Sequence, residues 1–173
     1  MNRKGALRGA SFVPQTPNVE GRTSMNLVFL GDTEHEKLQT ERIRVLQERE
    51  LAPTVIRWTP GDMTLFSELD QLASPITMIA SRHGSIPATS WTSRNPTRVR
   101  RLILLHPSLH LGLPYQPLPA PHFVPTMVVV NSKEFQPSAD QLSSLVGKFF
   151  HDYALHITPE SAELKDTLSL LSL

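Results

Sequence analysis

The stretch from Pro75 to Ser108 constrains the fold of this chain more than any other. It opens with an apolar run, Ile76 to Ala80, followed by a tight turn at residues 81–84 and an amphipathic segment. A basic corner, Arg98 to Arg101, then leads into a second apolar run, Leu102 to Leu105. A buried strand, a helix and a second buried strand in this order predict one βαβ unit with parallel strands. The first turn of such a unit is where functional groups are usually carried.

The same alternation continues along the rest of the chain. We expect strands at residues 25–30, 54–58, 76–80, 102–105, 125–130 and 153–157. We expect helices at residues 34–50, 63–73, 138–150 and 160–173, in addition to the helix of the central unit. Alternating strands and helices predict an α/β fold, a three-layer sandwich with a central parallel sheet of about six strands. In the first helix, the apolar spacing predicts that Leu38, Val45 and Leu46 face the sheet.

Two segments differ from this alternating pattern. Residues 1–24 hold several glycines and prolines and little apolar material, so they predict a flexible N-terminal tail. A true start of the protein at Met25 would explain the same composition. Residues 106–125 contain six prolines and predict an extended loop without helices. We therefore expect one folded domain, residues 25–173.

The composition excludes several classes of function. Seventeen basic and sixteen acidic residues give a formal net charge of +1, which argues against a nucleic-acid partner held by phosphate contacts. With no cysteine, the chain has no disulfide, thiol nucleophile or cysteine-bound zinc. No apolar run approaches the roughly 20 residues that span a bilayer, so we expect no membrane partner and a cytoplasmic location.

Cofactor and metal motifs are not found in the sequence. No glycine-rich nucleotide-binding loop occurs, so we expect no cofactor. His106 and His110 are four residues apart, but Pro107 breaks the helix that would align them. We therefore interpret the histidines as surface loop residues and expect no metal site.

Three motifs of the central unit follow one another at the spacing of a known family. Ala80-Ser81-Arg82-His83-Gly84 is followed by Asn95-Pro96-Thr97-Arg98-Val99 and then by Leu104-Leu105-His106-Pro107. Together they resemble the nucleophile-elbow unit of the α/β-hydrolase superfamily, where a strand leads through G-x-S-x-G into a helix. The resemblance implies the strand order 2-1-3-4-5-6. It places the turn at Arg82 beside the topological switch point, where ligands bind in such sheets. The proline-rich loop stands where the family inserts a helical cap, which implies a capless domain.

The catalytic positions implied by the resemblance hold unusual residues. The nucleophilic serine is replaced by Arg82, and the acid that follows the fifth strand is best matched by Glu134. The histidine expected after the sixth strand is missing, and Glu163 or Glu160 stands there. All three roles of the family's Ser-Asp-His triad are therefore altered together.

The turn after the first strand differs from the family as well. Hydrolases of this fold carry His-Gly there and use a backbone N–H of this turn to bind the oxyanion. Here Gly31-Asp32 occupies that turn, and a carboxylate beside a developing oxyanion is unfavourable.

Two functional hypotheses remain open at this point. The first is a catalytically degenerate member of the superfamily that binds a ligand or serves as a structural module. Its expected binding residues are Arg82, Gly31, Asp32, Glu134 and Glu163, and its partner is a small anionic ligand or another protein. Arg82 would then pair with Glu134 and Glu163, hold an anion at the helix N-terminus, or point into solvent. The oligomeric state is left open.

The second hypothesis is an esterase with a rearranged nucleophile. Ser81 lies one residue before the elbow position and Ser85 three residues after it. The only histidine near either of them in the sequence is His83, which would have to act as the base.

Overall fold

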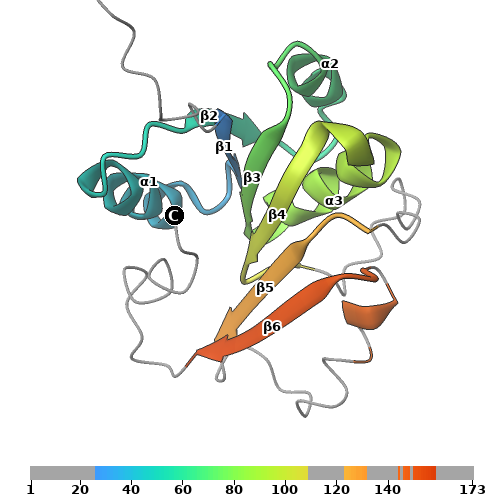
Figure 1. The fold of residues 1–173 in the computed structure, drawn as a ribbon. Coiled ribbons are helices and arrows are strands. Elements are labelled where there is room, and N and C mark those ends of the chain that lie inside the picture. Colours follow the sequence, from blue (N-terminus) through green and yellow to red (C-terminus); the bar gives the residue numbers. More distant parts are fainter. Residues whose placement is uncertain (1–25, 109–122, 132–143, 145, 149, 159–173) are drawn as a thin grey trace, which may run out of the picture.

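The computed structural model describes residues 26–108, 123–131, 144, 146–148 and 150–158 (Figure 1). Several expectations lie outside these residues: the tail at 1–24 with the start at Met25, most of the proline-rich loop, most of the helix at 138–150, the helix at 160–173, and the candidates Glu134, Glu160 and Glu163.

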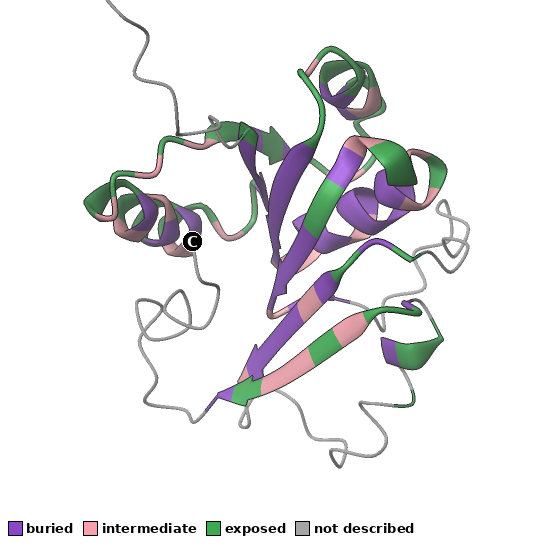
Figure 2. Ribbon diagram, viewed as in Figure 1, coloured by how far each residue is buried: buried purple, intermediate pink, exposed green. Residues whose placement is uncertain are grey.

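Six parallel strands form one sheet in the order β2-β1-β3-β4-β5-β6, which confirms the order expected from the resemblance (Figure 1). The strands are β1 (Asn26–Asp32), β2 (Thr54–Trp58), β3 (Ile76–Ser81), β4 (Val99–Leu105), β5 (Thr126–Asn131) and β6 (Tyr153–Thr158). All six residues of β3 are buried, as expected for a parallel strand covered on both faces. β6 lies at one edge of the sheet and is only partly buried (Figure 2).

Helices cover both faces of this sheet (Figure 1). The helical elements include α1 (Glu36–Glu48), α2 (Thr64–Asp70), α3 (Ser85–Arg94) and two single 3-10 turns, η1 (Arg82–Gly84) and η2 (Pro96–Arg98). α1 packs on one face, where Leu46 joins a buried cluster with Phe29 of β1. α2 and α3 pack on the other, so the molecule has the three layers expected from the sequence.

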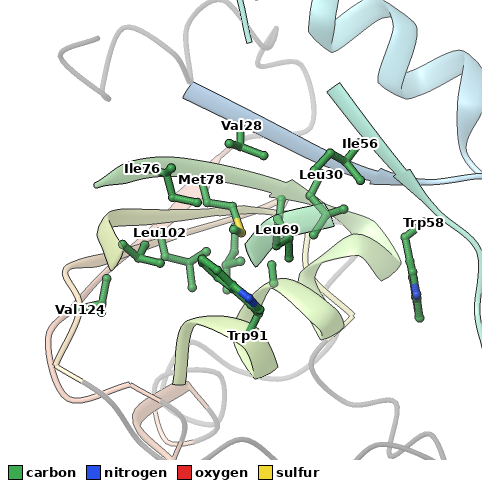
Figure 3. Packing of buried hydrophobic residues seen from close by; sticks show 14 of the residues in the cluster. Val28, Leu30, Ile56, Trp58, Leu69, Ile76, Met78, Trp91, Leu102 and Val124 are labelled. Carbon is green, nitrogen blue, oxygen red and sulfur yellow. The ribbon is translucent and has the colours of Figure 1, made fainter. Parts of the chain in front are cut away.

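The larger part of the core lies between the sheet and the pair α2 and α3 (Figure 3). Trp91 of α3 and Leu69 of α2 pack there against Met78 and Leu102 of the two central strands. The indole N–H of Trp91 donates to Oδ1 of Asp70 at 2.9 Å, so the polar end of this buried ring is satisfied.

The basic corner expected at residues 98–101 is mostly strand. β4 begins at Val99, and its register against β3 shifts between Ile76 and Thr77. Val99 pairs with Ile76 and Arg101 pairs with Thr77, so Arg100 is the extra residue of a bulge. The bulge lets two consecutive arginines stay exposed at the start of a strand that is otherwise buried.

Two helices also differ from the sequence prediction. In α1, the fully buried positions are Gln39, Arg42 and Leu46, whereas Leu38 and Val45 are half-buried. α2 ends at residue 70 rather than 73, and the chain leaves it through a turn before β3. No helix in the described part of the chain is long and apolar enough to cross a membrane.

Candidate functional site

The candidate site lies at the carboxyl ends of the neighbouring strands β1 and β3. These strands pair in parallel, so the turn that follows each of them emerges at the same edge of the sheet. β2 lies on one side of β1 and β3 on the other, so the strand order changes direction here. This is the topological switch point that the resemblance placed beside Arg82.

The chain turns sharply from β3 into α3 at Arg82. This residue has a φ of +52°, a left-handed conformation that is uncommon for a residue other than glycine. Gly84, two residues on, lies against β1: a Cβ added there would be 2.7 Å from the carbonyl oxygen of Leu30. The glycine therefore permits the close approach of the turn to the neighbouring strand.

Asp32, the last residue of β1, connects the two turns. Its side chain is fully buried. Oδ1 accepts hydrogen bonds from the backbone N–H groups of Glu34 and His35, both at 2.9 Å, and lies 2.8 Å from Nδ1 of His35. Oδ2 accepts the backbone N–H of His83 at 3.0 Å. One carboxylate thus fixes its own turn and joins it to the turn after β3.

The backbone N–H of His83 lies at a position that has a catalytic role in hydrolases with a nucleophile elbow. In hydrolases with a nucleophile elbow, the backbone N–H of the residue after the nucleophile binds the oxyanion of the transition state. His83 is the residue after the elbow position Arg82, and its N–H is directed at Asp32. The sequence predicted a carboxylate near the oxyanion position. In the structure, the carboxylate of Asp32 accepts the hydrogen bond of the N–H at that position.

Both candidate serines are buried and engaged in hydrogen bonds. Ser81 is fully buried, and its Oγ accepts a hydrogen bond from the guanidinium of Arg42, a residue of α1. Ser85, the first residue of α3, is also fully buried. Its hydroxyl donates to the carbonyl of Arg82 at 2.6 Å and accepts the N–H of Ser108 at 3.1 Å. Both hydroxyls act here as connectors between segments of backbone or side chain.

Two imidazole rings lie at the rim of this site. His35 and His83 meet edge to face, with ring centroids 5.2 Å apart. Nδ1 of His83 lies 3.2 Å from Oε2 of Glu34. Each of the two histidines therefore lies beside a carboxylate: His35 beside Asp32, and His83 beside Glu34.

The structure brings together some of the expected residues and leaves others untested. Arg82, Asp32 and the neighbouring His83 lie at one edge of the sheet, and Gly31 packs beneath the side chain of Gln39. Arg82 was expected to pair with Glu134 and Glu163. Both glutamates lie outside the described residues, so the charge cluster stays a prediction.

The role of His35 is absent from the sequence prediction. A signal for it exists in the spacing Asp32-x-x-His35, which places both residues in the turn after a strand. The strand order 2-1-3 brings this turn next to the one that carries His83. Combining the spacing with the strand order would have found the pair.

Comparison with protein families and with curated proteins finds no match. Among solved structures, the chain is similar to Est1E from Butyrivibrio proteoclasticus, an α/β-hydrolase-fold esterase. The superposition has a TM-score of 0.57 and covers 89% of this chain and 86% of the other, at 10% sequence identity. Identity this low supports a shared fold and no more. Together with the six parallel strands in the order 2-1-3-4-5-6, it shows that this chain has the α/β-hydrolase fold.

Proposed function

We propose that this protein is a non-hydrolytic member of the α/β-hydrolase fold that acts as a binding or structural module. The observation that carries the proposal is the hydrogen bond from the N–H of His83 to the carboxylate of Asp32. A substrate carbonyl needs this N–H at the moment negative charge develops on its oxygen. A buried carboxylate in the same place both occupies the donor and repels the charge.

The residue at the elbow supports the same conclusion. Arg82 has the left-handed backbone of a nucleophile elbow, but a guanidinium has no nucleophilic lone pair at neutral pH and does not lose its proton in proteins. Nucleophile and oxyanion site are thus altered at the same time. Either change alone would strongly reduce acyl transfer, since removal of one oxyanion donor costs about 100- to 1000-fold in kcat.

The alternative esterase needs Ser81 or Ser85 as the nucleophile. Each hydroxyl is fully buried and already hydrogen-bonded, Ser81 to Arg42 and Ser85 to two backbone groups. A nucleophile has to be accessible to the substrate and within reach of a base. The geometry of both serines therefore favours the non-hydrolytic role.

The binding role also favours some ligands over others. A small anion at the start of α3 would use the N–H of His83, and Asp32 already supplies a negative group there. A protein partner, or a ligand that tolerates this carboxylate, fits the site better than a free anion.

The test is an activity-based labelling experiment on the purified full chain, treated with a chelator beforehand. We expect a fluorophosphonate probe to label no serine stoichiometrically. With short p-nitrophenyl esters, we expect no saturable hydrolysis. The variant Arg82→Ser should behave in the same way, because Asp32 still occupies the N–H of His83.

Two variants serve as controls in this experiment. Ser93→Ala removes a partly buried hydroxyl of α3 that donates only to the carbonyl of Ser90, so it reports on nonspecific labelling. Ser81→Ala removes one candidate nucleophile. Stoichiometric labelling that disappears in Ser81→Ala and persists in Ser93→Ala would overturn the proposal. Hydrolysis that appears in Arg82→Ser would also contradict it, since that would require an intact base and oxyanion site.

A further inference from the structure

The side chains of Asp32, His35 and His83 form a convergent set of potential metal ligands. One ligand atom from each of the three residues can be chosen so that all three atoms lie within 4.8 Å of one another. They come from two turns that are about 50 residues apart in sequence and are held together by the hydrogen bond between Asp32 and His83. This arrangement goes beyond what is needed to join the turns, because that hydrogen bond uses no imidazole.

Because of Asp32, this edge of the sheet favours a bound cation over a bound anion. In an active hydrolase the two turns present N–H groups to an anion. Here the N–H groups of Glu34, His35 and His83 all point at the carboxylate of Asp32 and are satisfied by it. Beside the buried oxygens of Asp32 lie two partly exposed imidazole rings and the exposed carboxylate of Glu34. These are groups that bind cations.

The distances suit a single ion. Nδ1 of His35 lies 2.8 Å from Oδ1 of Asp32, and Nδ1 of His83 lies 3.2 Å from Oε2 of Glu34. In a tetrahedral site with bonds of about 2.1 Å, the ligand atoms lie about 3.4 Å apart. The ligand atoms of Asp32, His35 and His83 lie within 4.8 Å of one another, so the widest pair has to close by at most about 1.4 Å. The rings can make this movement, because the side chains of His35 and His83 are 34% and 23% exposed.

We infer that Asp32, His35 and His83 bind a divalent transition-metal ion such as Zn²⁺, and that the exposed carboxylate of Glu34, which lies beside His83, turns in to supply a fourth ligand. At both His35 and His83 the ion takes the place of any proton on Nδ1, and that proton moves to Nε2 of the same ring or is released to solvent. No bond to carbon forms or breaks. The inference deepens the binding role proposed above and rests on it, because it names the class of ligand.

The ligand set selects the metal. Imidazole nitrogen suits Zn²⁺, Cu²⁺, Ni²⁺ and Fe²⁺, whereas Ca²⁺ and Mg²⁺ prefer a shell made only of oxygen atoms. Two nitrogens and two carboxylate oxygens match the four-coordinate sites of zinc. The exposed edges of His35, His83 and Glu34 give the ion a path from solvent to the buried oxygen of Asp32.

The experiment is calorimetric titration of Zn²⁺ into the full chain, produced without a histidine tag and freed of metal with a chelator. We expect one Zn²⁺ per chain. His35→Gln and His83→Gln should each weaken binding by at least about tenfold, the lower end of what disturbing a metal site costs. His151→Gln is the matched control. This exposed histidine stacks on Phe123, and its replacement should leave the affinity within twofold.

A second measurement uses the unmodified chain, so its result does not depend on whether the variants fold. Addition of Zn²⁺ should shift the ring resonances of His35 and His83 in NMR spectra and leave those of His151 and His156 in place. Co²⁺ bound in place of Zn²⁺ should show visible absorption bands typical of cobalt coordinated by nitrogen and oxygen atoms. Equal Zn²⁺ affinity in the wild type and in the double variant His35→Gln/His83→Gln would overturn the inference, as would ring shifts confined to other histidines.

The result can be separated from the test of the proposed function, because labelling of serine is measured on metal-free protein. Absence of Zn²⁺ binding together with absence of serine labelling would reject the metal site and leave the non-hydrolytic role in place. Specific Zn²⁺ binding together with stoichiometric serine labelling would reject the non-hydrolytic role and support the metal site.

Discussion

Replacement of Asp32 by asparagine tests the most connected side chain of the site. The amide keeps one oxygen, which can still accept the N–H groups of Glu34 and His35. Its NH₂ group then takes the place of Oδ2 and faces the N–H of His83, so two donors oppose each other. A hydrogen bond to a charged group contributes about 1.5–3 kcal/mol, and its loss here is not compensated.

We therefore expect Asp32→Asn to lower the free energy of unfolding by about 2–3 kcal/mol. This is a large share of the roughly 5–15 kcal/mol that stabilises a typical domain. For a chain of this size it corresponds to a decrease in Tm of about 4–12 °C. The replacement Asp32→Ala removes every acceptor and leaves three N–H groups without a partner, so we expect it to cost about 3–5 kcal/mol.

The assay is urea unfolding of chelator-treated protein, followed by circular dichroism. Glu48→Gln is the control for removal of a carboxylate charge. Glu48 pairs with Arg44 at 3.7 Å with both side chains more than half exposed, so its loss should cost under about 0.5 kcal/mol. A difference of less than about 0.5 kcal/mol between Asp32→Asn and wild type would refute the claim that this carboxylate holds the two turns together.

Three further predictions concern backbone and hydrogen bonding. Gly84→Ala places a Cβ 2.7 Å from the carbonyl oxygen of Leu30, and we expect a loss of about 1–3 kcal/mol in urea unfolding. Ser85→Ala removes a buried hydroxyl with two backbone partners, and we expect a loss of about 1–3 kcal/mol, measured in the same way. The backbone N–H of Thr64, followed by its hydroxyl, lowers the pKa of Asp62 below its ordinary value of 3.8. The ionised form thus stabilises the fold above that pH, and the stability difference between wild type and Asp62→Asn should disappear as the pH falls through the lowered pKa.

The strands of the sheet could be predicted from the sequence because each is a short apolar run bounded by polar residues. β2 was predicted at its observed bounds, and the other strands differ by a few residues at their ends. The largest difference is at β4, where consecutive arginines indicated a loop. Their exposure depends on a bulge at Arg100, which is a property of the pairing with β3 and is not encoded in the local pattern.

The buried face of α1 was predicted less well. Apolar spacing favoured Leu38 and Val45, but Gln39 and Arg42 are the positions buried beside Leu46. Their polar groups are directed at the central turns: Arg42 donates to Ser81, and Gln39 covers Gly31. A pattern based on hydrophobicity cannot detect polar residues that are buried because they serve a polar site.

Part of the candidate site could be expected from the sequence together with the resemblance. The elbow motif placed Arg82 at the turn after β3, and the turn after β1 placed a carboxylate in its vicinity. The direct contact between Asp32 and the N–H of His83 depends on the conformation of both turns, which no single segment determines. The meeting of His35 and His83 depends on it as well.

The same contact explains how the sharp turn at Arg82 is stabilised. The left-handed backbone of Arg82 costs about 1–3 kcal/mol, and in an active hydrolase the same strain exposes the nucleophile. Here the hydrogen bond from His83 to the charged carboxylate of Asp32 contributes about 1.5–3 kcal/mol, which is enough to offset that strain. Gly84 allows the close approach that the bond requires. The residue that stabilises this turn is therefore also the one that accepts the N–H of His83, so we expect Arg82→Ser to keep the turn and to gain no hydrolytic activity.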